Sequence, residues 1–178
     1  AVANTYSVQG ETVTELIFPL SVQTDDGNLI GSYSETYLFA ANAIRFTSAD
    51  YTGAFTLNGT PFVEEDATSL PVEIGEADGT FAITGIPYAK SVLAQYNESA
   101  NFLTVSAQTL ATQKVNGQFK KMSLLTTMGG EETDAPLLLE MSLRGIIELS
   151  PLSEADGFAI YCEADDKVFG GMYDIRLP

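Results

Sequence analysis

Apolar residues at every second position recur along almost the whole chain, and this alternation constrains the fold more than any other feature. Successive side chains of a β-strand point to opposite faces of a sheet, so a half-buried strand is apolar at alternate positions. Such runs lie at residues 16–22, 51–57, 81–83, 92–96, 103–105, 137–143, 158–162 and 173–177. The pattern predicts an all-β protein of about ten or more short strands.

Pairs of residues that favour tight turns separate these runs. Asn-Gly and Asp-Gly tolerate the positive φ that hairpin turns require. Turn signals of this kind stand at 25–28, 58–59, 78–79, 116–117, 129–130 and 156–157. They predict an antiparallel meander that closes into a barrel, with a two-sheet β-sandwich as the alternative. Alternation near both ends of the chain favours the barrel, because a terminal strand at each end could pair to close it.

Three segments stand apart from this pattern. Residues 35–43 fit either two turns of helix with Ser34 as N-cap or a further strand, and residues 152–155 fit a single turn after a proline. The segment 127–136 is acidic, glycine-rich and closed by a proline, which predicts a long exposed loop. Strands of similar type continue on both sides of that loop. We therefore predict a single β domain over residues 1–178.

The charge is strongly negative, with 24 acidic and 8 basic residues and a net charge of −16. Phosphate backbones and anionic headgroups are repelled by such a field, so we expect no nucleic-acid partner. No stretch approaches the roughly 20 apolar residues of a membrane helix. The residues after Ala1 show no basic or apolar leader region, so we expect either a cytosolic protein or one whose leader was removed.

The absence of histidine limits the chemistry available to the chain. It excludes a Ser-His-Asp triad, a Cys-His pair and histidine-ligated zinc. The single cysteine, Cys162, shares a strand face with Phe158 and Ile160, so we expect a buried, inert thiol. No phosphate-binding or dinucleotide-binding glycine loop is present. We therefore expect no cofactor and no enzymatic activity, and we assign no catalytic residue.

Two catalytic arrangements remain as alternatives. Two carboxylates could act as the acid and base of a glycoside hydrolase, but the sequence does not select a pair among 24 acidic residues. A Ser-Lys dyad would combine Ser91 or Ser123 with Lys90, Lys120 or Lys121. The Ser-x-x-Lys spacing of known dyads is absent, which makes this the weaker alternative.

Acidic clusters at 25–28, 64–66, 131–134 and 165–166 offer the hard oxygen atoms that Ca²⁺ prefers. None follows the alternating Asp-x-Asp-x-Asp-Gly spacing that aims several side chains at one point. Solvated loop charge is the favoured interpretation, and no metal ligand is assigned.

Two kinds of ligand are compatible with a β domain of this composition. Tyrosine rings could stack against a glycan, although most of them occupy alternating strand positions where a half-buried ring is common. The tyrosines in question are Tyr33, Tyr37, Tyr51, Tyr88, Tyr96, Tyr161 and Tyr173. A barrel could instead enclose a small apolar molecule, although small barrels often fill their interior with side chains. No ligand-binding residue is assigned.

Three stretches carry a resemblance to a known group of proteins. They are Tyr-Thr-Gly-Ala-Phe-Thr-Leu-Asn-Gly-Thr at 51–60, Thr-Phe-Ala-Ile-Thr-Gly-Ile at 80–86 and Leu-Thr-Val-Ser-Ala-Gln at 103–108. Their order resembles the lipocalin-like (calycin-type) β-barrel domains of secreted and surface lipoproteins of Bacteroidetes. The resemblance covers about residues 45 to 125 and consists of strand patterns with structural glycines, so no functional residue carries over. The chain lacks a Gly-x-Trp motif, so lipocalin function does not transfer.

The resemblance implies a lipocalin-like barrel in the periplasm or on the outer-membrane surface. A signal peptide and a lipid-anchored cysteine would precede Ala1 and make the protein peripheral to the membrane. We therefore expect a non-catalytic extracytoplasmic binding or adhesion module of a bacterial surface lipoprotein, with a glycan or a small apolar molecule as ligand. A carboxylate-dependent glycoside hydrolase and a structural domain of a surface assembly are the alternatives.

Overall fold

The computed structural model describes residues 1–175 of the chain. Strands make up 59% and helices 4% of the structure, which confirms the all-β prediction. Every strand pair is antiparallel, as the hairpin signals predicted. Contacts divide the chain into two compact units, Ala1–Arg45 with Ser142–Gly145, and Phe46–Met141 with the chain from Ile146 onward. The single domain over 1–178 stays a prediction.

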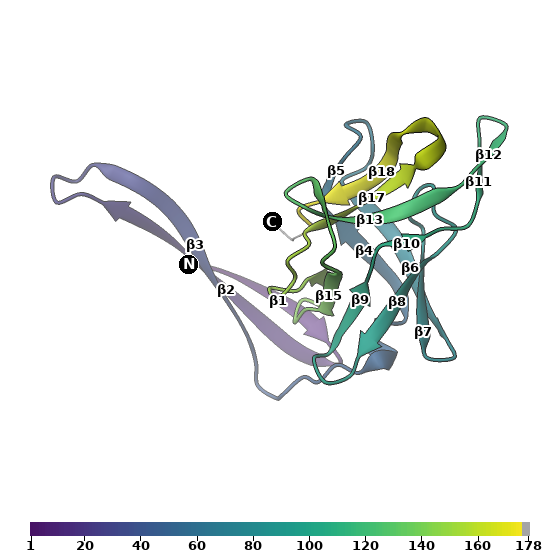
Figure 1. Ribbon diagram of the computed structural model, residues 1–178. Helices are drawn as coiled ribbons and strands as arrows, with labels where there is room; N and C mark the ends of the chain where they lie inside the picture. The colour runs from purple at the N-terminus through teal and green to yellow at the C-terminus, as the bar shows by residue number, and fades with distance from the viewer. Residues whose placement is uncertain (176–178) are drawn as a thin grey trace. The chain divides into compact units, whose positions relative to one another are not determined.

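The first unit is a three-stranded sheet in the order β1-β2-β3 (Figure 1). Its strands are β1 (Val2–Val8), β2 (Glu11–Gln23) and β3 (Leu29–Ala40). The turn between β1 and β2 places Gln9 and Gly10 at φ 53° and 78°, a tight turn that the dipeptide signals missed. The sequence predicted either helix or strand for residues 35–43, and in the structure residues 35–40 belong to β3. The segment is a strand because residues 35–40 pair with residues 13–18 of β2.

The apolar alternation of β2 does not mark a buried face in this unit. Phe18, Leu20 and Val22 expose 38%, 36% and 45% of their surface, although the alternation predicted that they face a core. The prediction was wrong because no second layer within the first unit covers this side of the sheet. The buried positions of β2 are instead Val13 and Glu15, on the opposite face.

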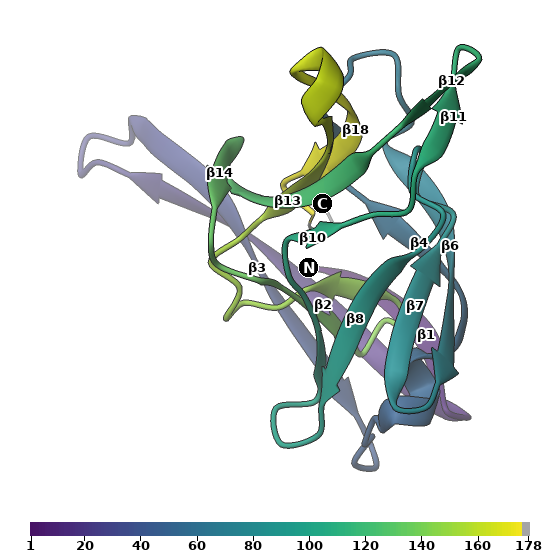
Figure 2. The same ribbon diagram turned by 45° about the vertical axis from the view of Figure 1, so that its right-hand side comes forward.

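The second unit contains a seven-stranded sheet in the order β16-β15-β9-β8-β7-β6-β4. Figure 2 shows four neighbouring strands of this sheet, β8, β7, β6 and β4. The strands of the sheet are β4 (Gly53–Asn58), β6 (Ser69–Ala77), β7 (Thr80–Thr84), β8 (Val92–Asn97), β9 (Phe102–Val105), β15 (Leu137–Met141) and β16 (Ile147–Leu149). The outermost strands β16 and β4 contact each other, so the sheet nearly closes into a barrel. Terminal strands do not close it, contrary to the prediction, because β1 to β3 form a sheet of their own.

A second sheet of this unit has the order β10-β13-β17-β18-β5, with β14 beside β13. Its strands are β5 (Thr60–Pro61), β10 (Gln108–Thr109), β13 (Met122–Met128), β14 (Glu131–Thr133), β17 (Gly157–Cys162) and β18 (Lys167–Tyr173). A separate hairpin joins β11 (Gln113–Val115) and β12 (Gln118–Lys120), and short 3₁₀ turns lie at Ser48–Tyr51 and Glu163–Asp165. With two sheets, a sandwich description also fits this unit.

Alternate side chains of both sheets meet in one apolar core. Phe81 and Ile83 of β7, and Phe158 and Ile160 of β17, are at most 4% exposed, as their alternation predicted. Cys162 is fully buried in the same core, which confirms the expected buried thiol. Burial of each such large side chain contributes about 1.5 to 3 kcal/mol, so this core is the main source of stability.

Four of the predicted turns join adjacent antiparallel strands in the structure. The turn at 25–28 connects β2 to β3, with the backbone N–H of Thr24 donating to the carbonyl oxygen of Asn28 at 2.9 Å. Residues 78–79, 116–117 and 129–130 all have positive φ and join adjacent antiparallel strands. The last of these turns corrects the long loop predicted over residues 127–136, because β13 continues through it into β14. The single turn expected after Pro151 is present, with Ser153 N–H donating to the carbonyl oxygen of Ser150.

Two predicted turns were wrong. Residues 58–59 join β4 to β5, which lie in different sheets, and Gly157 begins β17. A Cβ on Gly157 would lie 2.5 Å from the backbone oxygen of Met172, so glycine there permits close strand approach rather than a turn. In the predicted last strand, β18 ends at Tyr173 and Ile175 is buried beyond it. Arg176 and Leu177 lie outside the described residues.

We predict that Gly85→Ala destabilises the protein by about 2 to 4 kcal/mol. Gly85 has φ +96°, and an added Cβ would lie 2.4 Å from the backbone oxygen of Pro71. Gly75→Ala is the matched control, because Gly75 lies in the neighbouring strand with nothing within 4 Å of an added Cβ. Urea denaturation measures both, and an equal effect of the two substitutions would contradict the prediction.

Candidate functional site

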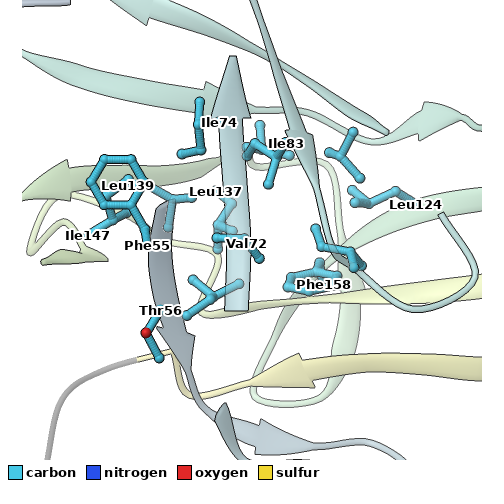
Figure 3. Close-up of a pocket in the computed structure, with 14 residues that line it drawn as sticks. Phe55, Thr56, Val72, Ile74, Ile83, Leu124, Leu137, Leu139, Ile147 and Phe158 are labelled. Carbon is cyan, nitrogen blue, oxygen red and sulfur yellow. The ribbon is translucent and has the colours of Figure 1, made fainter. Parts of the chain in front are cut away.

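The interior of the barrel-like sheet is filled by side chains. The cavity between its strands has a volume of about 20 Å³. Figure 3 shows side chains that line it, among them the apolar Phe55, Ile74, Leu139 and Phe158 and the polar Thr56. A space of this size accommodates about one water molecule. The interior therefore has no room for the small apolar ligand that a barrel could have enclosed.

Two polar hollows lie on the outer surface of β8 and β9. One has a volume of about 340 Å³ and the other, more open, about 710 Å³, and both include Gln95 and Thr104. Gln95 lies directly opposite Thr104 across the strand pair. The rim of the larger hollow holds one carboxylate, Glu98, and one aromatic ring, Tyr96. The hydroxyl of Tyr96 donates to Asn101 Oδ1 at 2.8 Å. Amide and hydroxyl groups of this kind can hydrogen-bond a sugar.

Tyr51, the first residue of the resemblance, has a structural role. Its side chain is fully buried, and its hydroxyl donates to the backbone oxygen of Asn101 at 2.7 Å. The same hydroxyl accepts a hydrogen bond from the backbone N–H of Met141 at 2.9 Å. Burial raises the pKa of Tyr51 to about 12, so the phenol stays protonated. The residue joins segments that are 90 positions apart.

Gln108, the last residue of the resemblance, also supports the sheet. Its side-chain amide accepts from the backbone N–H of Leu93 at 2.8 Å and donates to the carbonyl oxygen of Leu93 at 2.9 Å. The amide thus replaces a strand partner for β8, where β9 has already ended. Tyr51 and Gln108 are therefore structural, in agreement with the interpretation of these stretches as strand patterns.

The seven candidate tyrosines do not converge on one site. Tyr51 and Tyr96 pack against each other, with ring centroids 5.5 Å apart. Tyr88 packs on Phe169, Tyr173 packs on Phe62, and Tyr161 donates to Asp166. Tyr33 and Tyr37 both stand exposed on β3, where they share a face.

The acidic clusters do not form a metal site in the part of the chain that the structure describes. Within residues 1–175, no group of three or more acidic or cysteine side chains is placed to hold a metal ion. Asp165 instead forms an ion pair with Lys120, which also lies 5.6 Å from the ring centroid of Phe169. Lys120, one of the lysines considered for a Ser-Lys dyad, thus has a carboxylate partner.

One pair of carboxylates lies on adjacent strands. Glu140 of β15 is directly opposite Glu148 of β16, on the face away from the core. Partial burial is the main cause that raises the pKa of Glu140, and the charge of Glu148 adds to it, whereas a hydrogen bond with Ser150 lowers it. Neither carboxylate lines the interior cavity or the two polar hollows. The pair has the composition of an acid–base couple, but it lies outside these three cavities.

A buried ion pair holds the first unit together. Glu15 is 3% exposed, and one of its carboxylate oxygens accepts from Asn4 at 2.8 Å and from Tyr6 at 2.9 Å. The other oxygen accepts from Arg144, including from Nε at 2.8 Å. The hydrogen bond from Asn4 is the main cause that lowers the pKa of Glu15, with Arg144 and Tyr6 contributing. Both carboxylate oxygens are engaged, so this carboxylate is structural.

The long hairpin of β2 and β3 carries an exposed apolar surface, which we call the hairpin face. Because residues paired across an antiparallel ladder share a face, the register defines its members. They are Leu16, Phe18, Leu20 and Val22 of β2 with Tyr33, Tyr37 and Phe39 of β3. The tyrosines and Phe39 are 50% to 54% exposed. Phe18 and Tyr37 pack edge to face, with ring centroids 5.9 Å apart.

The opposite side of the same hairpin is largely polar towards its tip. Ser21 pairs with Ser32, and Pro19 pairs with Ser34. The hairpin is therefore amphipathic, with its apolar side in solvent. Sequence reasoning identified the alternation but interpreted it as a core face, since a periodic pattern does not show whether a second layer covers it.

Comparison with protein-family profiles, with curated proteins and with solved structures found no match. Within residues 1–175, no helix is long and apolar enough to cross a lipid bilayer.

We predict that Tyr51→Phe destabilises the protein by about 1 to 3 kcal/mol, because the buried N–H of Met141 loses its acceptor. Tyr33→Phe is the matched control, since this ring is exposed and its substitution should change stability by less than about 0.5 kcal/mol. Chemical denaturation followed by tyrosine fluorescence or circular dichroism compares them. Equal stabilities would show that the hydroxyl of Tyr51 is not needed.

We predict that Glu15→Gln costs about 3 kcal/mol or more at neutral pH, because it removes the buried carboxylate charge that pairs with Arg144. A carboxyl whose folded-state pKa is lowered stabilises the protein above its unfolded-state pKa, and this contribution is lost as the pH falls through the folded-state value. The difference between wild type and variant should therefore shrink from pH 7 towards pH 3. Denaturation across that range measures it, with the exposed Glu76→Gln as control. A difference independent of pH would contradict the prediction.

Proposed function

We propose that this chain is a non-catalytic extracytoplasmic binding or adhesion module of a bacterial surface lipoprotein, and that the hairpin face is the surface through which it binds. The observation that carries the proposal is the uncovered apolar side of β2 and β3. Contiguous apolar surface on a soluble protein commonly marks an interaction site. Covering these side chains would contribute about 1.5 to 3 kcal/mol for each large residue that becomes fully buried.

Because side chains fill the interior, the binding surface that we propose lies on the exterior of the protein. A ligand enclosed by the strands would need several hundred cubic ångströms, and the cavity has about 20 Å³. The outer hollows at Gln95 and Thr104 offer polar groups to a glycan but contain no exposed stacking platform. A protein surface with apolar side chains fits the hairpin face better than either ligand fits its site.

The extracytoplasmic location and the lipid anchor are supported by the resemblance to Bacteroidetes surface lipoproteins. Its three stretches include β4, β7 and β9 of the barrel-like sheet, where strands were expected. The strongly acidic composition suits exposure to solvent. A structural domain of a surface assembly would use the hairpin face in the same way, with a permanent neighbour in place of an exchangeable one.

We predict that the triple variant Phe18→Ser, Leu20→Ser, Val22→Ser binds at least about tenfold more weakly to intact cells of the bacterium that encodes the protein. Loss of apolar contact area is the physical reason. Flow cytometry with the fluorescently labelled chain measures binding. The control is the double variant Ser21→Ala, Ser32→Ala on the polar side, which should bind as the wild type does. Equal binding of all three proteins, or no binding by any, would refute the proposal.

A carboxylate-dependent glycoside hydrolase stays the second candidate, because Glu140 and Glu148 lie opposite each other with the pKa of Glu140 raised. We expect no release of reducing sugar from a polysaccharide panel by the wild type or by Glu140→Gln. Release by the wild type that Glu140→Gln abolishes would establish the hydrolase instead.

A further inference from the structure

We infer that the partner of the hairpin face is a β-strand of another protein, that it pairs with the free edge of β3, and that it carries a lysine or arginine among alternating apolar residues. This inference rests on the proposed function and specifies the chemistry of the partner. Three observations carry it: an unpaired strand edge, the side on which the apolar residues lie, and the sign of the charge around them.

Within residues 1–175, no strand pairs with the outer edge of β3. β3 has 12 residues and pairs with β2 alone, since it is the last strand in the order β1-β2-β3. Unpaired backbone N–H and C=O groups along an edge are a template for another strand. Proteins commonly protect such edges with short strands, lysines or prolines. β3 contains neither lysine nor proline, whereas the two-stranded hairpin of β11 and β12 carries Lys114 and Lys120.

The sheet specifies where the partner's apolar side chains lie. On β3, the apolar side holds Tyr33, Tyr37 and Phe39, and the other side holds Ser32 and Ser34. A strand paired with this edge extends both faces, because side chains opposite each other in a ladder point to the same side. The partner strand should therefore be apolar at alternate positions, on the side that continues the hairpin face.

The negative charge of the hairpin specifies that the partner strand should carry a positive charge. The segment Glu11–Ala40 contains five acidic residues and no lysine or arginine, and among these five only Glu15 forms an ion pair within the described residues, with Arg144. Glu35 lies on the hairpin face between the two tyrosines and accepts from the hydroxyl of Tyr37 at 2.7 Å. A cation on the apolar side of the partner would face this carboxylate. Complementary charge of this kind determines which partner associates.

A second copy of this chain does not meet the charge requirement. Each copy has a net charge of −16, and antiparallel pairing of two β3 edges would bring two Glu35 carboxylates towards each other. Like charges across an interface oppose association. Anionic lipid headgroups are repelled for the same reason.

The probe is a nine-residue peptide of alternating valine and threonine with lysine in place of the central valine. It presents alternating apolar residues and one cation on the same side of a strand. One control peptide has glutamate at the centre. A second control keeps the lysine sequence but is N-methylated at alternate residues, which removes backbone donors without changing the side chains. Fluorescence anisotropy at low salt measures the binding of each peptide to the full chain.

We predict that the lysine peptide binds at least about tenfold more tightly than either control, and that it slows hydrogen exchange of backbone amides within Leu29–Ala40. Glu35→Lys should reverse the preference, so that the glutamate peptide binds more tightly than the lysine peptide. Ser34→Lys is the comparison variant, because it introduces a lysine on the opposite side of β3 and should leave the preference unchanged. A charge-swap of this kind distinguishes pairing beside Glu35 from general attraction to an acidic protein.

Several results would overturn the inference. Equal binding of the N-methylated peptide, or protection confined to β2, would show that the face binds without strand pairing at the β3 edge. That result would leave the proposed function intact, because cell binding and its loss in the serine triple variant test it separately. Failure of all peptides to bind would overturn the inference, as would a dimer in sedimentation that Glu35→Lys alters. Binding to phosphatidylcholine vesicles without peptide binding would identify a membrane as the partner instead.

Discussion

Burial of alternate side chains in one apolar interior is the constraint on which the second unit depends. Strands of both sheets contribute to it, and residues as distant in sequence as Leu57 and Met172 belong to the same core. The polar residues of the resemblance serve this arrangement. Tyr51 connects two segments through its hydroxyl, and Gln108 supplies the hydrogen bonds that β8 lacks where β9 ends. Packing leaves a cavity of about 20 Å³, so the interior is occupied by the protein itself.

The first unit follows the same strand physics with a different outcome. Apolar and polar residues alternate along its hairpin as strictly as along the core strands, yet the apolar side is exposed. The buried polar residue of the hairpin, Glu15, forms an ion pair with Arg144. Glu15 accepts hydrogen bonds from Asn4, Tyr6 and Arg144, which compensate the cost of removing its charge from water. The hairpin therefore gains order from backbone pairing and from that charge cluster more than from an apolar core. This balance leaves its apolar side uncovered within the first unit.

These two environments explain where prediction from sequence was right and where it was wrong. The alternation of Phe81 and Ile83, and the Asp-Gly pair at 78–79, are local features that a strand and a hairpin turn require, so they were interpreted correctly. Gly157 follows Asp156, and this Asp-Gly pair has the same sequence as the pair that forms a hairpin turn at 78–79. Its actual role, the close approach of Met172, depends on a strand that is distant in sequence. The exposed stripe from Phe18 to Val22 was assigned to the core because periodicity reports amphipathicity and carries no information about a covering layer.

For the candidate site, too, some features follow from the sequence alone and others depend on the tertiary structure. The lack of histidine and the single cysteine exclude most catalytic groups on composition alone, because those chemistries require particular side chains. The opposition of Glu140 and Glu148, and the sharing of one face by Tyr33 and Tyr37, depend on strand register, which the sequence did not reveal.

By itself, the sequence determined that the chain forms antiparallel strands with a buried thiol and an acidic surface, because alternation, turn residues and charge act locally or additively. Only the tertiary structure decided which apolar faces are covered. The strands from β4 onward enclose their apolar sides in a shared interior, whereas β2 and β3 have no second layer in their unit. Coverage is a property of packing between distant segments, and for this protein it separates the core from the surface proposed to bind.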